Sequence, residues 1–410
     1  MRSPPLRGVG SAAALVVLVA TAPAWAQPSD AVALLSPEAA VAAALAVHPD
    51  VRAAEAELLL ARGLRSESAF LLANPQASAQ TTFDGTRTSL GLTQPLSLTG
   101  EGWHARRSTS ARVDATEAWL LRSRLLVAAE TRIAYVDAVV AAGRVRVARD
   151  GVELASRMRR AVTRQNEEGE ASLLDLRLAR LGEVQAAAGL MDAREREAGT
   201  LRAMAGRIGM SVASGALVPD PLAVVPRPTQ SAPDERSDVV AARAALQAAE
   251  AELRLQRAAS LPPIGVGAFV EVEDGQTFIG PTLNLEIPLF DRNQAGRASA
   301  RGEVLAAESH VATVAARAHT EVATAGFRVA EADGLSAMLV TDPIAEAHEA
   351  LASIESGYLA GEIDLPSTVL LQGEVLEGEA AAIELLGQLA TARLDLLLAT
   401  EDPAMLGGAP

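Results

Sequence analysis

Residues 264–287, IGVGAFVEVEDGQTFIGPTLNLEI, decide the fold. In the first half of this stretch the apolar residues at every second position are Ile264, Val266, Ala268, Val270 and Val272. Successive side chains of a β-strand point to opposite faces, so this spacing predicts a strand with one apolar face. On the return strand one face holds Ile279, Leu283, Leu285 and Ile287, and the other holds Gly280, Thr282, Asn284 and Glu286. Asp274-Gly275 between them is typical of a tight turn, so 264–287 is predicted to be a β-hairpin.

A shorter and weaker hairpin is predicted at residues 76–94. Its alternating residues are Ser89, Gly91 and Thr93 against Leu90 and Leu92, with Asp84-Gly85 at the tip. Strands of about 8 to 10 residues are long enough for a tilted crossing of a bilayer.

Four strands per chain predict a membrane barrel shared between chains. Val266 and Leu285, which we expect near the middle of their strands, are the candidate lipid-facing residues. Four strands cannot close a barrel, and an open sheet in lipid would leave unpaired backbone groups at both edges. Three chains supply twelve strands, an even number that makes a barrel wide enough for a channel, so we expect a homotrimer.

The two hairpins belong to a structural unit that occurs twice. The recurring pairs are Pro49-Asp50-Val51 and Ser237-Asp238-Val239, Asp84-Gly85 and Asp274-Gly275, Gln94-Pro95-Leu96 and Ile287-Pro288-Leu289, and Gly169-Glu170 and Gly361-Glu362. Their offsets stay between 188 and 193 residues. Each copy is predicted to run helix, hairpin, very long helix, sharp turn, helix.

The long helices are predicted at residues 104–166 and 292–357, where Ala-rich helical patterns are broken mainly by scattered glycines and Pro343. Each would be roughly 90 to 100 Å long and would need packing partners along its whole length. Pairs of shorter helices have the matching lengths. We expect 172–212 and 235–260 to pair with the first long helix, and 50–73 and 366–401 to pair with the second.

The chain therefore divides into five predicted segments. They are a signal peptide at 1–26, a first repeat at 27–212 with its tip near 169, a Pro-rich non-helical linker at 213–234, a second repeat at 235–402 with its tip near 361, and a tail at 403–410. The signal peptide is predicted from Arg2 and Arg7, the apolar run after them, and small residues at Ala24 and Ala26. The predicted class is mainly α, a long antiparallel α-helical barrel with a small β part.

Composition excludes several kinds of site. The chain has no cysteine, so it has no disulfide, no thiolate metal site and no lipid anchor on cysteine. Its five histidines show no zinc-type spacing, and we expect no metal site and no cofactor. Acidic residues number 51 against 36 basic ones, which disfavours nucleic acid as a partner and favours cations near the surface or in a pore.

Three other classes of protein are alternatives to a channel. On the helices alone, an ordinary coiled-coil bundle is the simpler interpretation, and the hairpins argue against it. An enzyme is not expected, because no nucleophile elbow, phosphate loop or paired carboxylate and histidine motif is present. A periplasmic adaptor protein would carry one helical hairpin, whereas this chain repeats the whole unit.

Particular stretches resemble the TolC-like outer-membrane efflux family over essentially the whole chain after the signal peptide. They are Leu35–Ala40 running to His48-Pro49-Asp50-Val51, Gln94-Pro95-Leu96, Ile287–Gln294, and Ser356-Gly357-Tyr358-Leu359-Ala360-Gly361-Glu362. The resemblance implies a trimer with a β-barrel in the outer membrane and an α-helical barrel in the periplasm, docked on an adaptor protein and, through it, on an inner-membrane pump. The segment from Pro288 to Gln294 looks most like the heavy-metal cation branch. The expected function is a passive exit duct for cations or small toxic compounds, and export of drugs or type I secreted polypeptides is the alternative.

The resemblance also implies roles at the two tips. Gly169, Glu170, Gly361 and Glu362 match the region that meets the adaptor, and glycine is expected where a chain reverses through positive φ. Acids near this end constrict the pore in the family, and the candidates here are Asp175, Glu362 and Asp364. The positions that match an acidic pair in some members hold Ser367 and Leu370, so an acidic ring in this chain must be built differently.

Overall fold

The computed structural model describes residues 34–67, 74–82, 87–96, 99–226, 236–260, 264–285, 290, 292–336 and 343–407. The predicted signal peptide at 1–26 and the tip of the first hairpin at 84–85 lie outside these residues.

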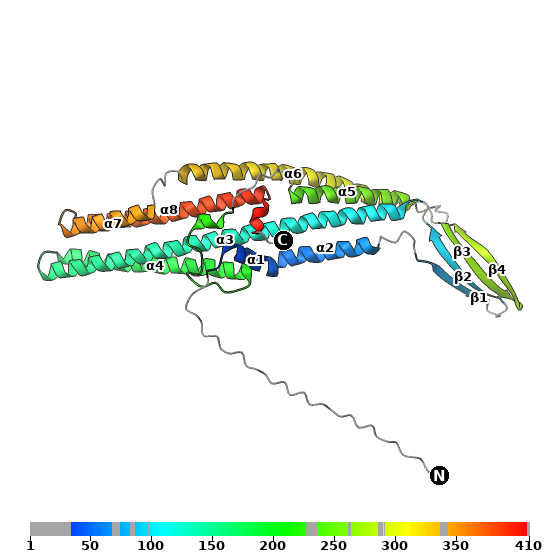
Figure 1. Ribbon diagram of the computed structural model, residues 1–410, viewed down its shortest axis with the longest axis horizontal. Coiled ribbons are helices and arrows are strands. Elements are labelled where there is room, and N and C mark those ends of the chain that lie inside the picture. Colours follow the sequence, from blue (N-terminus) through cyan, green and yellow to red (C-terminus); the bar gives the residue numbers. More distant parts are fainter. Residues whose placement is uncertain are drawn as a thin grey trace, which may run out of the picture. The chain divides into compact units, whose positions relative to one another are not determined.

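The described chain is mainly helical with one small sheet, as predicted (Figure 1). The α-helices are α1 (Pro37–Val47), α2 (Pro49–Glu67), α3 (Glu101–Glu167), α4 (Leu173–Ile208), α5 (Ser237–Ala258), α6 (Gln294–Ser336), α7 (Pro343–Leu359) and α8 (Leu365–Ala399). The 3-10 helices are η1 (Pro221–Val224) and η3 (Pro403–Leu406), and the strands are β1 (Gln76–Thr81), β2 (Arg87–Leu96), β3 (Ile264–Glu273) and β4 (Gln276–Leu285). None of the described helices combines the length and the apolarity that crossing a membrane requires.

The four strands form one antiparallel sheet in the order β1-β2-β3-β4. Because β2 pairs with β3 over ten residues, the hairpins of the two repeats are joined by backbone hydrogen bonds. The second hairpin turns at Asp274 and Gly275, which have φ angles of 47° and 80°. A two-residue turn with positive φ at both positions matches the right-handed twist of its strands, which explains the Asp-Gly sequence.

The first long helix is confirmed, and the second is described in two parts. Helix α3 has 67 residues and is about 100 Å long. The expected second helix is described as α6 and α7, with residues 337–342 outside the described chain. As predicted, α4 and α5 pack along α3, and α8 packs along α6 and α7.

The expected partner of α2 was wrong within a single chain. Helix α2 packs against α3 and not against the second long helix, and α5 lies between α3 and α6. Figure 1 shows the resulting layer in the order α2, α3, α5, α6. The lengths of the segments predicted how many short helices pack along the long ones. Helix length does not indicate which long helix each short helix contacts.

Glycines let α3 and α8 approach closely. A Cβ atom on Gly143 would lie 3.0 Å from Cγ2 of Ile383, and one on Gly151 would lie 3.1 Å from a methyl carbon of Leu376. On α8, a Cβ atom on Gly387 would overlap a methyl group of Val140. Large side chains on each helix therefore fill the space that glycine leaves on the other.

The segment between α4 and α5 is fixed to the middle of α3. The guanidinium of Arg132, which is 1% exposed, donates to the carbonyl oxygens of Val224 at 2.8 Å and Met405 at 3.1 Å. The Tyr135 hydroxyl donates to the carbonyl of Leu35 at 2.6 Å and accepts from the amide of Val218 at 2.8 Å. Residues 213–226, the described part of the predicted linker, contain η1 but no α-helix.

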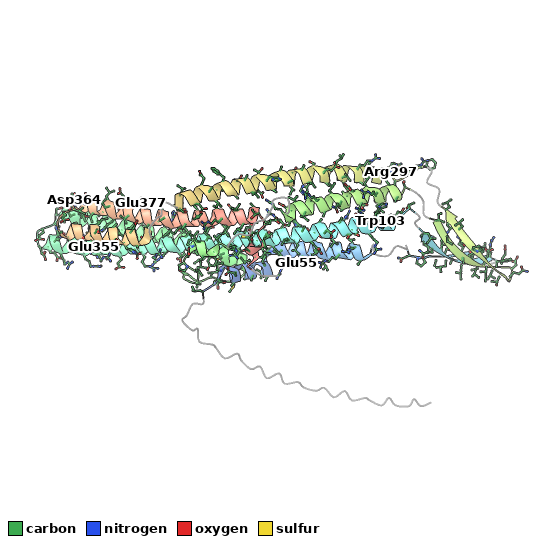
Figure 2. The ribbon with its side chains drawn as sticks, turned by 45° about the horizontal axis from the view of Figure 1, so that its top comes forward. Glu55, Trp103, Arg297, Glu355, Asp364 and Glu377 are labelled. Atoms are coloured by element: carbon green, nitrogen blue, oxygen red, sulfur yellow. The ribbon has the colours of Figure 1, made fainter. Side chains whose placement is uncertain are left out.

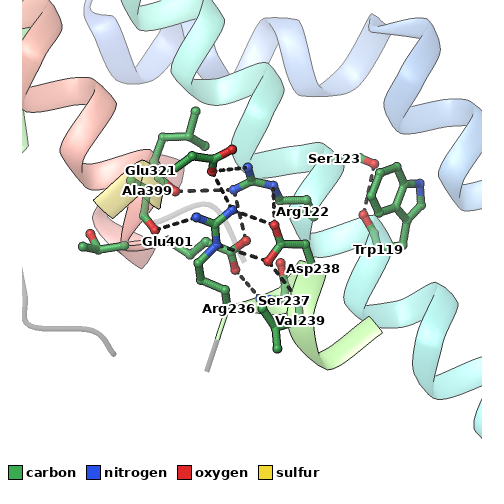
Figure 3. Close-up of polar contacts among 12 residues, drawn as sticks. Trp119, Arg122, Ser123, Arg236, Ser237, Asp238, Val239, Glu321, Ala399 and Glu401 are labelled. Carbon is green, nitrogen blue, oxygen red and sulfur yellow. Dashed lines mark hydrogen bonds and ion pairs between the residues drawn. The ribbon is translucent and has the colours of Figure 1, made fainter. Parts of the chain in front are cut away.

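A network of five charges, built around the buried guanidinium groups of Arg122 and Arg236, joins α3, α5, α6 and the end of α8 (Figure 3). The Arg236 guanidinium donates to Asp238 at 2.6 and 3.1 Å, lies 2.9 Å from the Glu321 carboxylate, and donates to the carbonyl of Ala399 at 3.2 Å. Arg122 donates to Glu401 at 3.1 Å. Removing one partner of such a network would leave an uncompensated buried charge, so it fixes how the two repeats meet.

The close approach of α3 and α8 predicts opposite effects for two glycine substitutions on α8. Gly387→Ala should destabilise the protein by about 1 to 3 kcal/mol, because Val140 is stiff at χ1 and cannot turn away from the added methyl group. Gly378→Ala meets no atom within 4 Å and should stabilise the helix by roughly 0.5 to 1 kcal/mol. Denaturant unfolding of both variants in detergent checks this, and equal shifts for both would contradict the packing.

Candidate functional site

The two helical hairpins end in the same turn. At the first tip, Gly169 has a φ of 82°, and the carbonyl of Gln165 accepts from the amides of Glu170 at 2.7 Å and Ala171 at 3.1 Å. At the second tip, Gly361 has a φ of 76°. There the carbonyl of Gly357 accepts from the amides of Glu362 at 2.9 Å and Ile363 at 3.3 Å. The predicted positive φ of both glycines is confirmed, and left-handed glycine at a helix end explains why this residue recurs.

Two of the three predicted constriction acids cap helices. The Asp175 carboxylate accepts from the amide and the hydroxyl of Ser172 at 3.0 and 2.6 Å, while the Ser172 hydroxyl accepts from the amide of Asp175. In the second copy the acidic residue is at the N-cap and the serine lies three residues later. There the Asp364 carboxylate accepts a hydrogen bond from the amide of Ser367 at 3.1 Å. The hydrogen bonds from Ser367 hold the pKa of Asp364 below its usual range.

The predicted docking residues are exposed. Glu170 and Glu362 are exposed, and neither forms an ion pair with a described residue. Asp364 is at the free end of the α7–α8 hairpin (Figure 2). The sequence therefore located these acids correctly at the tips, but it did not show that Asp175 and Asp364 are engaged in helix caps.

A tyrosine that the sequence analysis did not single out as a site links the two hairpins. The Tyr358 hydroxyl donates to the side-chain carbonyl of Gln165 at 2.7 Å. The ring packs among buried residues from both hairpins: Met158, Val162, Leu176, Ala179 and Leu365. Burial raises the pKa of Tyr358, and the nearby Asp175 carboxylate raises it further. Tyr358 is one of only two tyrosines in the chain, and its position before the second tip was the available signal.

An open groove of about 1670 Å³ follows α3 between α4 and α8. The charged residues that line it are Asp137, Arg144, Asp192, Arg196, Arg328, Glu377, Glu384 and Asp395. Arg144 pairs with Glu384, and Arg328 pairs with Asp395 at 3.4 Å. Burial raises the pKa of Asp137 and of Asp395, in both cases against the attraction of a nearby arginine.

A buried carboxylate on α8 has no hydrogen-bond partner among the described residues. Glu379 is 2% exposed, and neither of its carboxylate oxygens is bonded. The charged groups that act on it are His348 of α7 and Arg146 and Asp150 of α3. Burial raises the pKa of Glu379, because the loss of solvation outweighs the attraction of His348 and Arg146.

The raised pKa predicts that stability falls as the pH rises. In unfolded chains Glu379 loses its proton near the usual pKa of a glutamate, whereas the folded protein keeps that proton to higher pH. The free energy of unfolding therefore decreases as the pH rises from the pKa of Glu379 in the unfolded chain to its pKa in the folded protein. Above both values it decreases no further.

We expect Glu379→Gln to raise the melting temperature at pH 8, with the gain shrinking toward pH 4. The change Glu377→Gln serves as the control, because Glu377 is exposed on the same helix (Figure 2). Thermal unfolding of both variants across this pH range measures the effect. A gain for Glu379→Gln that does not vary with pH would contradict the assignment.

The two faces of the sheet differ in polarity. Cross-strand partners share a face, so the pairs Val266–Leu283, Val270–Ile279, Ile264–Leu285, Leu90–Val270 and Leu92–Ala268 form one apolar face that continues across three strands. On this face Ile279 is 76% exposed and Leu283 is 73% exposed. The predicted facing of Val266 and Leu285 agrees with this pattern. Their expected position near the middle of the strands is wrong, because Val266 is the third residue of β3 and Leu285 is the last residue of β4.

Glycine and polar side chains make up most of the opposite face. Phe269 pairs with Gly91 on one side and Gly280 on the other, and a Cβ atom on Gly280 would lie 2.9 Å from its ring. Arg87 and Glu271 form an ion pair at 2.7 Å across β2 and β3. Phe269 was not predicted from the sequence to be important. Its ring lies between two strands that carry glycine, which explains why glycine recurs opposite it.

The described residues contain no cluster of three histidine, aspartate, glutamate or cysteine side chains that could hold a metal ion.

Known proteins resemble the chain in sequence and in fold. Residues 229–400 match the family model described as outer membrane efflux protein. The fold matches a membrane protein from Pseudomonas aeruginosa with a TM-score of 0.72 and 20% identity, covering 89% of this chain and 90% of that one. It also matches CusC, whose structures were reported for transmembrane channel formation, with a TM-score of 0.71 and 18% identity over 89% and 92% of the two chains.

The family model thus matches the second repeat, and the fold of the described chain is that of these solved membrane proteins. Among its relatives in sequence is the nickel-cobalt-cadmium resistance protein NccC of Alcaligenes xylosoxydans xylosoxydans. The two are 27% identical over 251 residues, which cover 59% of this chain. The match spans 56% of NccC, little more than half of its length.

Proposed function

We propose that the chain is the outer-membrane channel subunit of a tripartite efflux system. Three copies form a passive exit duct from the periplasm to the outside, with the sheets in the outer membrane and the helices in the periplasm. The observation that carries the proposal is the sheet with one exposed apolar face and one polar, glycine-rich face. This alternation is what a barrel strand between lipid and a water-filled lumen requires.

The edges of the sheet support the trimer. In the described chain β1 and β4 each pair with one strand only, so each has one edge without backbone partners. Exposed edges are not stable in lipid, because no water is available to satisfy the backbone groups. Pairing β4 of one copy with β1 of the next satisfies both edges and closes a barrel of twelve strands.

Metal cations are the cargo that we propose. Acidic residues are in excess, and residues 350–378 around the second tip hold five acids and no arginine, so threefold symmetry would concentrate negative potential there. The NccC relative is named for resistance to nickel, cobalt and cadmium. Loss of the gene should sensitise cells to these metals and leave drug tolerance and polypeptide secretion unchanged. Sensitivity to drugs alone, or loss of a secreted polypeptide, would favour the alternative cargoes.

Substitution with arginine tests which face of the sheet meets lipid. We expect Ile279→Arg, near the middle of β4, to destabilise the folded barrel by about 2 to 4 kcal/mol, and Val266→Arg and Leu285→Arg, nearer the strand ends, to cost less. Thr282→Arg is the control, since Thr282 pairs with Gly267 on the polar face. Unfolding in detergent or lipid measures the difference, and equal destabilisation by Ile279→Arg and Thr282→Arg would refute the facing.

Charge removal at the second tip tests the passage of cations. Glu362→Gln with Asp364→Asn should lower the preference for cations over anions in planar bilayers, because it removes two acids per chain near the proposed constriction. Asparagine is also a good N-cap, so the cap on α8 that Asp364 provides is retained. The outcome that contradicts this role is unchanged selectivity in channels that still conduct.

Backbone geometry at the second tip tests adaptor docking there. Gly361→Val should abolish export while trimers remain, since a β-branched residue is strained at a φ of 76° and the turn must rearrange. Gly361→Asn should keep export, because asparagine tolerates the left-handed region. Cellular export assays with both variants, combined with trimer analysis in detergent, make the comparison. Normal export with Gly361→Val would mean that the turn does not dock a partner.

A further inference from the structure

The helix ends that adjoin the sheet hold exposed arginines. Helix α3 begins five residues after β2 ends, α5 ends six residues before β3 begins, and α6 begins nine residues after β4 ends. Figure 2 shows Trp103 and Arg297 at these ends of α3 and α6. Five exposed arginines lie here, and we call them the junction arginines: Arg106, Arg107, Arg257, Arg292 and Arg301.

None of the junction arginines forms an ion pair with a described residue. Further along α3, by contrast, several arginines pair with carboxylates: Arg122, Arg144, Arg157 and Arg159. Acids are scarce close to the sheet. Residues 101–112 contain three arginines and one acid, and residues 292–302 contain three arginines and no acid. In a chain with 51 acidic and 36 basic residues, the starts of α3 and α6 are therefore positively charged.

Exposed aromatic rings accompany these arginines. Trp103 is 55% exposed, and the guanidinium carbon of Arg107 lies 5.6 Å from the centre of its ring. Phe290, two residues before Arg292, is 91% exposed. Tryptophan concentrates at the boundary between lipid and water, and arginine lays its apolar stem there while its charged group stays in the polar region. The starts of α3 and α6 thus have the residue types of a membrane interface.

The backbone at the start of α3 adds positive partial charge. Its N-cap, Gly100, has a φ of 75° and no side chain that could cap the first amides of the helix. Those amides are at the positive end of the helix dipole and favour an anion. Side chains of a helix lean toward its N-terminus, so Arg106 and Arg107 extend in the same direction. Together these groups suit a phosphate, which a guanidinium binds through two oxygens.

The charge at the opposite end of the helices has the other sign. Residues 350–378, around the second tip, contain five acids and no arginine. A surface that only keeps a protein soluble can mix both signs along its length. Their separation here indicates that the two ends of the helices meet different surroundings, and that those at the junction are anionic.

We propose that the junction arginines and Trp103 bind the phosphate groups of anionic phospholipids, in the leaflet from which the helices project. This inference rests on the proposed function, because it takes the sheet to lie in the outer membrane. The attraction of an anionic membrane surface for arginine falls off within about 8 Å at physiological salt, so only arginines next to the sheet reach it. In the trimer the site recurs around the barrel and fixes the depth of the sheet in the bilayer.

Tryptophan fluorescence of the channel reconstituted in liposomes tests the proposal. Trp25→Phe with Trp119→Phe keeps only Trp103, and Trp25→Phe with Trp103→Phe keeps only Trp119. Phosphatidylglycerol or phosphatidylcholine with brominated acyl chains quenches a tryptophan that it touches. At Trp103 we expect phosphatidylglycerol to bind about five times more strongly than phosphatidylcholine, which is the factor that one arginine near an anionic surface supplies. Trp119 lies about 24 Å further along α3 and should be quenched by neither lipid.

Charge removal identifies the groups that select the lipid. Arg106→Gln with Arg107→Gln should reduce the fivefold preference at Trp103 to about one, because the phosphate loses its partners. Arg146→Gln with Arg149→Gln is the matched control. These two arginines of α3 are also exposed and form no ion pair with a described residue, but they lie about 60 Å further from the sheet. The control should keep the preference, and millimolar inorganic phosphate should not reduce it.

The outcomes separate this inference from the proposed function. Trimers that conduct in planar bilayers, but in which both lipids quench Trp103 equally, overturn the lipid site and leave the channel intact. A preference that survives Arg106→Gln with Arg107→Gln, that is lost equally in the control, or that inorganic phosphate abolishes also overturns the site, as does equal quenching of Trp119. Protein that neither forms trimers nor conducts contradicts the proposed function, and the lipid site with it.

Discussion

Backbone hydrogen bonding at the edges of the four-stranded sheet constrains the rest of the molecule. The sheet has one apolar face, and in the described chain its outer strands each have one partner. In lipid, each unpaired backbone group would cost several kcal/mol, so the edges require neighbouring chains. Once the sheets are arranged around an axis, the helical layers that follow them in sequence must also meet between chains.

The two repeats use equivalent residues for different purposes. In the second repeat, Arg236 and Asp238 are buried in a network of charges at the start of α5. The equivalent residues of the first repeat are His48 and Asp50, and the Asp50 side chain is 78% exposed. One copy of this site is completed inside the chain, and the other is left open.

Much of the fold could be predicted from the sequence, because its elements depend on local patterns. Alternation at 264–272 predicted β3, Asp274-Gly275 predicted the turn, and the tip glycines have the expected positive φ. The partner of α2 was predicted wrongly, since a helix with apolar residues on two faces gives no indication of which face is covered within the chain. Recognising the covered face would have required separating positions 51, 54, 58 and 61 from 53, 56, 60 and 64.

The site was predicted less completely, because it depends on contacts between distant segments. Asp175 and Asp364 were expected at the tips, but their engagement in caps follows from Ser172 and Ser367, whose spacing was visible in the sequence. The bond between Tyr358 and Gln165 joins residues 193 positions apart, and no local pattern indicates it. Buried Glu379 likewise has the sequence context of an ordinary helical glutamate.

Which face of the sheet meets lipid can be measured directly along β4. Spin labels placed one at a time on cysteines at positions 277–285, in protein reconstituted in liposomes, report whether each site is reached by oxygen dissolved in lipid or by a water-soluble paramagnetic reagent. A membrane barrel predicts a period of two, with oxygen reaching 279, 281, 283 and 285 and the water-soluble reagent reaching 278, 280, 282 and 284. Uniform access to the water-soluble reagent at every position would contradict a membrane barrel.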